Sequence, residues 1–309
     1  MVSYRICNLV LGSDIPLPAL PYAGEERQEC SFRLVSGLRP SLTSVEWYQQ
    51  WPSADGGTWI AFGRMGSGYI LQFSDIASFT LSANFQDIQC LPRPGIPSET
   101  IEHLLLDQVL PLIVSSRGNL VLHASGVVTP TGAIAFLGAT GLGKSTLAAS
   151  FSEEGLPFLT DDCLVVKKDG DRILAVPSYP GLRLWPESLL AMFRYLPDLP
   201  QVAGYSTKKR LGADDRFPFH SELVALKRIY LLIEVASGIS IEPVKPRDAI
   251  PELMKYTFVM DINNRVDMRD KFEALSALAA RSLCYRLAFQ RDFSTLPDVR
   301  RAILAHVNT

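Results

Sequence analysis

The chain has no strong excess of either charge and no long apolar run. Its 309 residues include 30 basic and 32 acidic side chains, which give a formal net charge of −2. Without a basic excess, nucleic acid is not an expected partner. The most apolar stretch, 104–114, contains Asp107, Gln108 and Pro111, so it predicts a buried helix and not a membrane span. The first residues lack the apolar core of a secretory signal, and we expect a cytoplasmic protein that does not contact membranes.

Cysteine is also scarce. The five cysteines include no C-x-x-C pair, and their number is odd. This pattern predicts free thiols in a reducing compartment and argues against a zinc site. Cys163 lies directly after two acidic residues, but a buried structural thiol is the simpler interpretation.

The length predicts about two domains. Residues 1–95 contain short strand-like segments separated by turns, which predicts a small antiparallel β-rich domain or sheet extension. A proline-rich segment at 91–97 marks the boundary. Residues 96–309 mix strand and helix signals without a regular β-α-β rhythm, so we expect an α/β core built on a mixed sheet.

Several elements of this second part can be placed from hydrophobic spacing and end signals. Ser98 is expected to cap a helix that runs toward Arg117. The expected strands are 119–129 and 226–235, and the expected late helices are 270–282 and 297–307.

One short segment decides the class of protein. Residues 138–145 match the phosphate-binding pattern G-x-x-x-x-G-K-[ST] at every fixed position, between an apolar strand-like run and a helical segment. Backbone N–H groups of such a loop point at phosphate oxygens, Lys144 is expected to reach the β- and γ-phosphates, and Ser145 to ligate Mg²⁺. The residues expected to bind ATP here are Gly138, Ala139, Thr140, Gly141, Leu142, Gly143, Lys144, Ser145 and Thr146.

Two adjacent acids follow the loop helix. Asp161 and Asp162 stand at the end of the next apolar run. One carboxylate there can bind Mg²⁺, and the other can accept a proton from an attacking hydroxyl. Neighbouring residues of a regular strand face opposite ways, so both acids can serve one site only if the strand ends or bulges there. The alternative is a solvated Asp-Asp turn.

His123 lies in the strand that precedes the loop. A lone histidine in a strand is often a satisfied core residue. The end of this strand can also adjoin the phosphates, where His123 would orient a carboxylate or touch the transferred phosphoryl group.

Basic residues further along could complete the site, because phosphoryl transfer needs charge neutralisation. Arg183 is expected in a Pro/Gly-rich turn as a phosphate clamp, and Lys209 or Arg210 in a polar loop as a nucleotide contact. A polar loop at 261–265 is a weaker candidate for the same cleft. Solvated loops are the alternative in each case.

The ordered set His123-Ala124-Ser125-Gly126, the loop 138–145 and Asp161-Asp162 resembles the HPr serine kinase/phosphorylase family. The similarity covers about residues 118–175 and is closer to short relatives, including kinases found beside lasso-peptide genes. It implies a phosphoenolpyruvate-carboxykinase-like nucleotide fold and Mg²⁺-ATP-dependent phosphorylation of a serine hydroxyl. It also implies that Asp162 is the general base, with Asp161 by the metal and His123 beside them.

The chain departs from the family in two respects. Full family members carry Glu after the loop serine, where this chain has Thr146. The family's C-terminal segment for phosphorolysis is not found, so neither the reverse reaction nor HPr as substrate is implied.

We therefore expect a kinase acting on a serine of a peptide or protein, such as a lasso-peptide-type precursor. A small-molecule kinase and a regulatory ATPase without an acceptor remain open. An ABC-type ATPase and a GTPase are disfavoured because L-S-G-G-Q and N-K-x-D segments are absent from the sequence. The resemblance leaves a homo-oligomer open.

Overall fold

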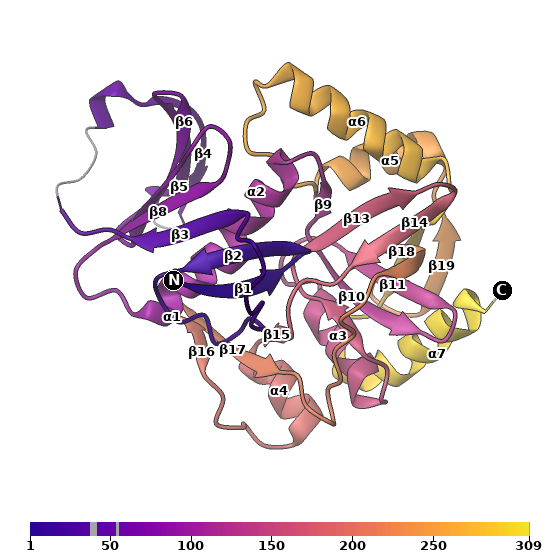
Figure 1. Cartoon of the computed structure of the whole chain (residues 1–309). Helices are drawn as coiled ribbons and strands as arrows, with labels where there is room; N and C mark the ends of the chain where they lie inside the picture. Colours follow the sequence, from indigo (N-terminus) through magenta and orange to yellow (C-terminus); the bar gives the residue numbers. More distant parts are fainter. Residues whose placement is uncertain (38–41, 54–55, 309) are drawn as a thin grey trace.

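The computed structural model describes residues 1–37, 42–53 and 56–308. Within these ranges, no helix combines the length and the apolar character needed to cross a bilayer. The architecture is mixed α/β, with three sheets and helices on both faces of the largest one (Figure 1).

The first sheet has eight strands in the order β1-β2-β3-β8-β7-β6-β5-β4, all before residue 95. Two of its pairings, β2 with β3 and β3 with β8, are parallel, so the sheet is mixed and not purely antiparallel as expected. The strands are β1 (Val2–Ile6), β2 (Leu9–Ser13), β3 (Cys30–Leu34), β4 (Glu46–Pro52), β5 (Thr58–Met65), β6 (Gly68–Phe73), β7 (Ala77–Leu81) and β8 (Asp87–Pro92).

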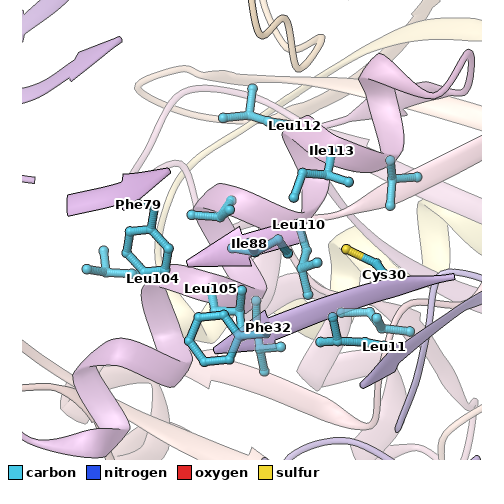
Figure 2. Close-up of a cluster of buried hydrophobic side chains, with 14 of the residues drawn as sticks. Leu11, Cys30, Phe32, Phe79, Ile88, Leu104, Leu105, Leu110, Leu112 and Ile113 are labelled. Carbon is cyan, nitrogen blue, oxygen red and sulfur yellow. The ribbon is translucent and has the colours of Figure 1, made fainter. Parts of the chain in front are cut away.

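One helical segment follows this sheet and packs against it. It consists of α1 (Ser98–Leu104), a π-helical turn η2 (Leu105–Val109) and α2 (Leu110–Ser116). The buried helix expected here is confirmed, but Ser98 is its first residue and not its cap, since Pro97 holds the N-cap position without a side-chain hydrogen bond. Figure 2 shows side chains of this segment packed among those of the sheet, in one continuous core. The boundary near residue 95 therefore divides the sequence but not the core.

The second sheet has nine strands and carries helices on both faces. Strand β18 pairs in parallel with β11 and β20, while the remaining pairings are antiparallel, which confirms the mixed sheet. Its strands are β9 (Leu120–Leu122), β10 (Ala124–Thr129), β11 (Gly132–Leu137), β12 (Phe158–Thr160), β13 (Leu164–Asp169), β14 (Arg172–Val176), β18 (Val224–Glu234), β19 (Ile239–Pro243) and β20 (Cys284–Phe289).

The run 119–129, expected as one strand, is two strands separated by His123. Strand β9 pairs with β13, whereas β10 pairs with β11 and β12. The chain changes neighbours at His123, whose N–H donates to the carbonyl of Tyr256 at 2.6 Å. Periodicity could not show this break, because both pieces are apolar.

Two apolar cores cover the faces of this sheet. Helices α3 (Lys144–Glu153) and α7 (Leu296–Val307) contribute to one core, and α5 (Pro246–Met254) and α6 (Arg265–Ala279) contribute to the other (Figure 1). The late helices expected from sequence are present. However, α6 begins at Arg265, earlier than predicted, because Asn264 caps it by accepting a hydrogen bond from the N–H of Asp267.

A third sheet is small and corrects two expectations. It contains β15 (Gly181–Leu184), β16 (Gln201–Ala203) and β17 (Ser206–Gly212), and α4 (Pro186–Phe193) follows β15. Arg183 therefore lies in a strand and not in a turn, and 208–210 lies in a strand and not in a polar loop. The polar composition of β17 misled the prediction because most of that strand is only partly buried.

The shared core leads to a prediction about stability. We expect Leu105→Ala to lower the free energy of unfolding by about 2–5 kcal/mol, because it leaves a cavity where the helical segment meets the first sheet. Denaturant unfolding would measure this change. Leu190→Ala is the control, since Leu190 on α4 is 47% exposed and should change stability by less than about 1 kcal/mol. Equal effects of the two variants would argue against a shared core.

Candidate functional site

The glycine-rich loop joins β11 to α3. Gly141 and Gly143 both have φ of 89°, a left-handed conformation that favours glycine, and Gly143 takes the N-cap position of α3. Lys144 Nζ donates to the carbonyl oxygen of Gly138 at 2.9 Å, so the lysine folds back over the loop. The loop thus sets a helix N-terminus and a buried cation beside one another, an arrangement suited to an anion.

Asp161 directly follows β12, and its carboxylate accepts hydrogen bonds from three other parts of the chain. Its Oδ1 accepts hydrogen bonds from Ser125 Oγ at 2.6 Å and from Ser145 Oγ at 2.8 Å. Its Oδ2 accepts from the N–H of Arg183 at 2.8 Å. The side chain is fully buried. Asp161 therefore reaches the cleft through the loop serine that it orients.

Asp162 points a different way because its backbone is left-handed. Its φ of 63° is a conformation that Asp tolerates better than most residues. Its Oδ1 lies 3.5 Å from His123 Nε2, and its Oδ2 lies 3.5 Å from Arg183 Nη2. The regular strand ends before the pair, which is the condition under which adjacent acids can serve one site.

The two acids differ in proton affinity. Burial, with the charge of Asp162, raises the pKa of Asp161 to about 6. Burial would also raise the pKa of Asp162, but its electrostatic interactions with His123, Lys208 and Lys144 outweigh that effect and lower the pKa. Burial lowers the pKa of His123 despite its acidic neighbour. At neutral pH, Asp162 is therefore an ionised carboxylate beside a neutral imidazole.

A cleft of about 830 Å³ opens in front of the loop. Trp185 and Tyr205, 40% and 41% exposed, stand on one side, and Lys208 lies 5.2 Å from the centroid of the Trp185 ring. Arg291 borders the loop, donating to the carbonyl of Gly141. Other residues that line the cleft include His103, Asp107, Gln108, His123, Asp162, Arg183, Glu187, Ser188, Phe289, Phe293 and Leu296.

The structure brings most of the expected residues together. Residues 140–146 line the cleft with His123, Asp162 and Arg183, while Gly138 and Ala139 line an adjoining hollow that also contains His123. Lys208, and not the expected Lys209 or Arg210, borders the cleft.

Other residues considered from the sequence do not line the cleft. Arg210 Nη1 donates to Glu102 Oε2 at 2.6 Å, and Asp261 pairs with Arg64 at 2.6 Å. Cys163 is a buried free thiol, as expected, with its sulfur 3.6 Å from that of Cys7.

Sequence reasoning did not select several residues that line the cleft. Asp107 carried a signal, since a carboxylate within an apolar helical run needs a buried partner. Other examples gave no signal that set them apart from their neighbours in the sequence. They are His103, Trp185, Tyr205, Lys208 and Arg291.

The residues present fit a metal ion that arrives with a nucleotide. In the part of the chain that the structure describes, no three His, Cys, Asp or Glu side chains gather at a point suited to a metal. Mg²⁺ in phosphate sites, however, takes most of its ligands from phosphates and water and needs one or two protein oxygens. The Ser145 hydroxyl and the Asp161 carboxylate, 2.8 Å apart, are such a pair.

No family model matches this chain, and no curated protein matches it. Among solved structures, it is similar to the HPr(Ser) kinase/phosphatase from Coxiella burnetii, at 10% sequence identity and a TM-score of 0.32. The match covers 61% of this chain and 97% of the other.

Proposed function

We propose that this chain is an Mg²⁺-ATP-dependent kinase that transfers the γ-phosphoryl group to a serine hydroxyl of a peptide or protein. One observation carries the proposal: the glycine-rich loop and the ionised carboxylate of Asp162 line the same cleft. A phosphate-binding loop holds the donor, and a nearby carboxylate can activate a hydroxyl acceptor.

The loop binds the triphosphate of ATP. Its backbone N–H groups and the N-terminus of α3 face the phosphates, and Lys144 exchanges its bonds to loop carbonyls for bonds to phosphate oxygens. Ser145 and Asp161 would hold Mg²⁺, which supplies neutralisation of the charge on the β- and γ-phosphates. Lys208, which also lines the cleft, adds positive charge.

Asp162 acts on the acceptor. Its carboxylate takes the proton of the serine hydroxyl while the serine oxygen bonds to the γ-phosphorus. The bond from that phosphorus to the β–γ bridging oxygen breaks, and its electron pair remains on ADP. Neutral His123, whose Nε2 lies 3.5 Å from Asp162 Oδ1, would orient that carboxylate. Transfer is thus in line, between ADP and the serine oxygen.

The open side of the cleft favours an extended acceptor. Trp185 and Tyr205 expose aromatic surface beside the loop, which suits the side chains that flank a serine in a peptide. A lasso-peptide-type precursor is one acceptor of this class.

Incubation with γ-labelled ATP tests the proposal. Separate reactions contain serine peptides, a mixture of hydroxylated metabolites, or no acceptor. We expect label on peptide serine. Label on a metabolite alone would identify a small-molecule kinase, and release of free phosphate alone would identify an ATPase; either result would overturn the proposed acceptor.

The pKa of Asp161 leads to a prediction about metal binding. Because this pKa is raised to about 6, Asp161 is protonated below that pH and ionised above it. We expect the affinity for Mg²⁺-ATP to fall as the pH is lowered through 6, with proton release on binding in that range. Isothermal titration at several pH values in buffers of different ionisation enthalpy would measure both.

ATP itself takes up a proton near this pH, so a control is required. Asp161→Asn removes the protein's contribution and should bind Mg²⁺-ATP more weakly at neutral pH, with a shallower pH dependence. If the wild type and Asp161→Asn have the same pH dependence, Asp161 plays no part in metal binding.

A further inference from the structure

A further buried carboxylate, that of Asp107, lies near the acid pair on a π-helical turn. Asp107 lies in η2, where the helix widens to a π-helical turn, and its side chain is 2% exposed. Such turns shift the direction of one side chain relative to the rest of the helix and occur often at functional sites. Here the shifted position carries a charged group at the edge of the cleft.

Three groups surround the Asp107 carboxylate. His103 Nδ1 lies 2.5 Å from Oδ2, and the Tyr179 hydroxyl donates to Oδ1 at 2.7 Å. The guanidinium of Arg183 pairs with the same Oδ1. Burial, with the charges of Arg183 and Arg210, lowers the pKa of His103 to about 3, so the histidine is neutral and donates through Nδ1–H.

Arg183 connects Asp107 to the acid pair. Its side chain is 1% exposed. Its backbone N–H and its Nε face Asp161 Oδ2, its Nη2 donates to the Asp161 carbonyl, and the same Nη2 lies 3.5 Å from Asp162 Oδ2. A buried guanidinium needs ion pairs and hydrogen bonds that offset the loss of its hydration. Asp107 supplies the side that faces away from the acid pair.

The other face of the helical segment is apolar and fixed by the first sheet. Leu104, Leu105 and Leu110 pack with Phe32 and Phe79 of that sheet, as Figure 2 shows. The sheet that sequence analysis left without a role is therefore the support of the turn that presents Asp107.

We infer that Asp107 is a positioning residue for phosphoryl transfer, which holds Arg183 against Asp161 and Asp162 from a turn supported by the N-terminal sheet. The inference rests on the proposed function for its kinetic consequence but not for its geometry. In this role Arg183 holds the two acids in place, which differs from the phosphate clamp expected from sequence.

Asp107→Asn tests this role, because asparagine keeps the shape and removes the charge. Glu102→Gln is a matched control. Glu102, on the preceding helix α1, is likewise a buried carboxylate, but it pairs with Arg210 and does not line the cleft. We expect Asp107→Asn to lower kcat by about 10–100-fold at nearly unchanged ATP KM, and Glu102→Gln to leave kcat unchanged. Equal losses in the two variants would overturn the inference.

The pH profile separates positioning from a simple change of charge. If Asp107→Asn releases Arg183, Asp162 loses a cation and the acid limb of kcat moves to higher pH. If Arg183 stays in place, the lost negative charge moves the limb to lower pH, which would contradict the inference. Among the described residues, the charged or titratable groups that interact with Asp162 include Asp161, His103, His123, Lys144, Cys163, Tyr179, Arg183 and Lys208.

A measurement that does not depend on activity separates the positioning role of Asp107 from the proposed kinase function. The Nε–H signal of Arg183 in ¹H–¹⁵N spectra, assigned with Arg183→Lys, should be protected from solvent exchange in the wild type and in Glu102→Gln but not in Asp107→Asn. Unchanged protection in Asp107→Asn would overturn the inference. Loss of protection in a protein that transfers no phosphate to any acceptor would support the contact and refute the kinase proposal.

Discussion

Replacing Asp162 by asparagine is expected to lower kcat for phosphoryl transfer by about 10²–10⁴-fold, with ATP affinity little changed. The carboxylate that takes the serine proton is lost, while the loop that binds ATP is untouched. Asparagine is the informative substitution because it tolerates the left-handed φ of 63° at this position. Alanine would add backbone strain to the loss of chemistry.

Both the rate of phosphoryl transfer and the affinity for ATP must be measured. Single-turnover transfer from labelled ATP gives kcat, and titration with ATP gives the affinity. Asp169→Asn, the same change at an exposed position on the β13–β14 hairpin, should behave as the wild type. Near-normal turnover by Asp162→Asn would remove its role as the base.

The acid side of the pH profile follows from the same residue. The neighbouring cations lower the pKa of Asp162, so its carboxylate stays ionised through the neutral range. Activity should therefore fall only when the pH drops well below neutrality, and an acid limb centred near pH 7 would require a different base.

Lys144→Ala is expected to cause the second large loss, about 10²–10³-fold in kcat/KM, together with weaker ATP binding. Lys144 is the buried cation of the loop, and no other described side chain donates to the Gly138 or Ala139 carbonyls in its place. Titration with ATP and steady-state kinetics measure the two effects. Lys167→Ala, at an exposed position on β13, is the control. Unchanged ATP affinity in Lys144→Ala would count against nucleotide binding by this loop.

The local parts of the site could be predicted from sequence because their chemistry is contained in short segments. The loop needs glycine at positions of left-handed φ, a strand before it and a helix after it, and all of these lie within residues 132–153. The acid pair follows one strand later. The mixed sheet could also be expected, since strand and helix signals did not alternate regularly.

The connections between segments could not be predicted. Arg183 meets Asp107 and Asp161 across long separations, and only the folded sheet β15–β17 brings it to them. Lys208 borders the cleft while Arg210 pairs with Glu102, although residues two apart share one face of a regular strand. The partner from α1, and not local composition, accounts for the difference. The break at His123 arises in the same way, from a change of neighbouring strands.

A crystal structure with Mg²⁺ and a non-hydrolysable ATP analogue tests the central claim most directly. We expect the triphosphate along the loop of residues 138–145, with its terminal phosphate at Lys144 Nζ and facing Asp162. An analogue bound elsewhere, or a terminal phosphate that lies away from Asp162, would contradict the account.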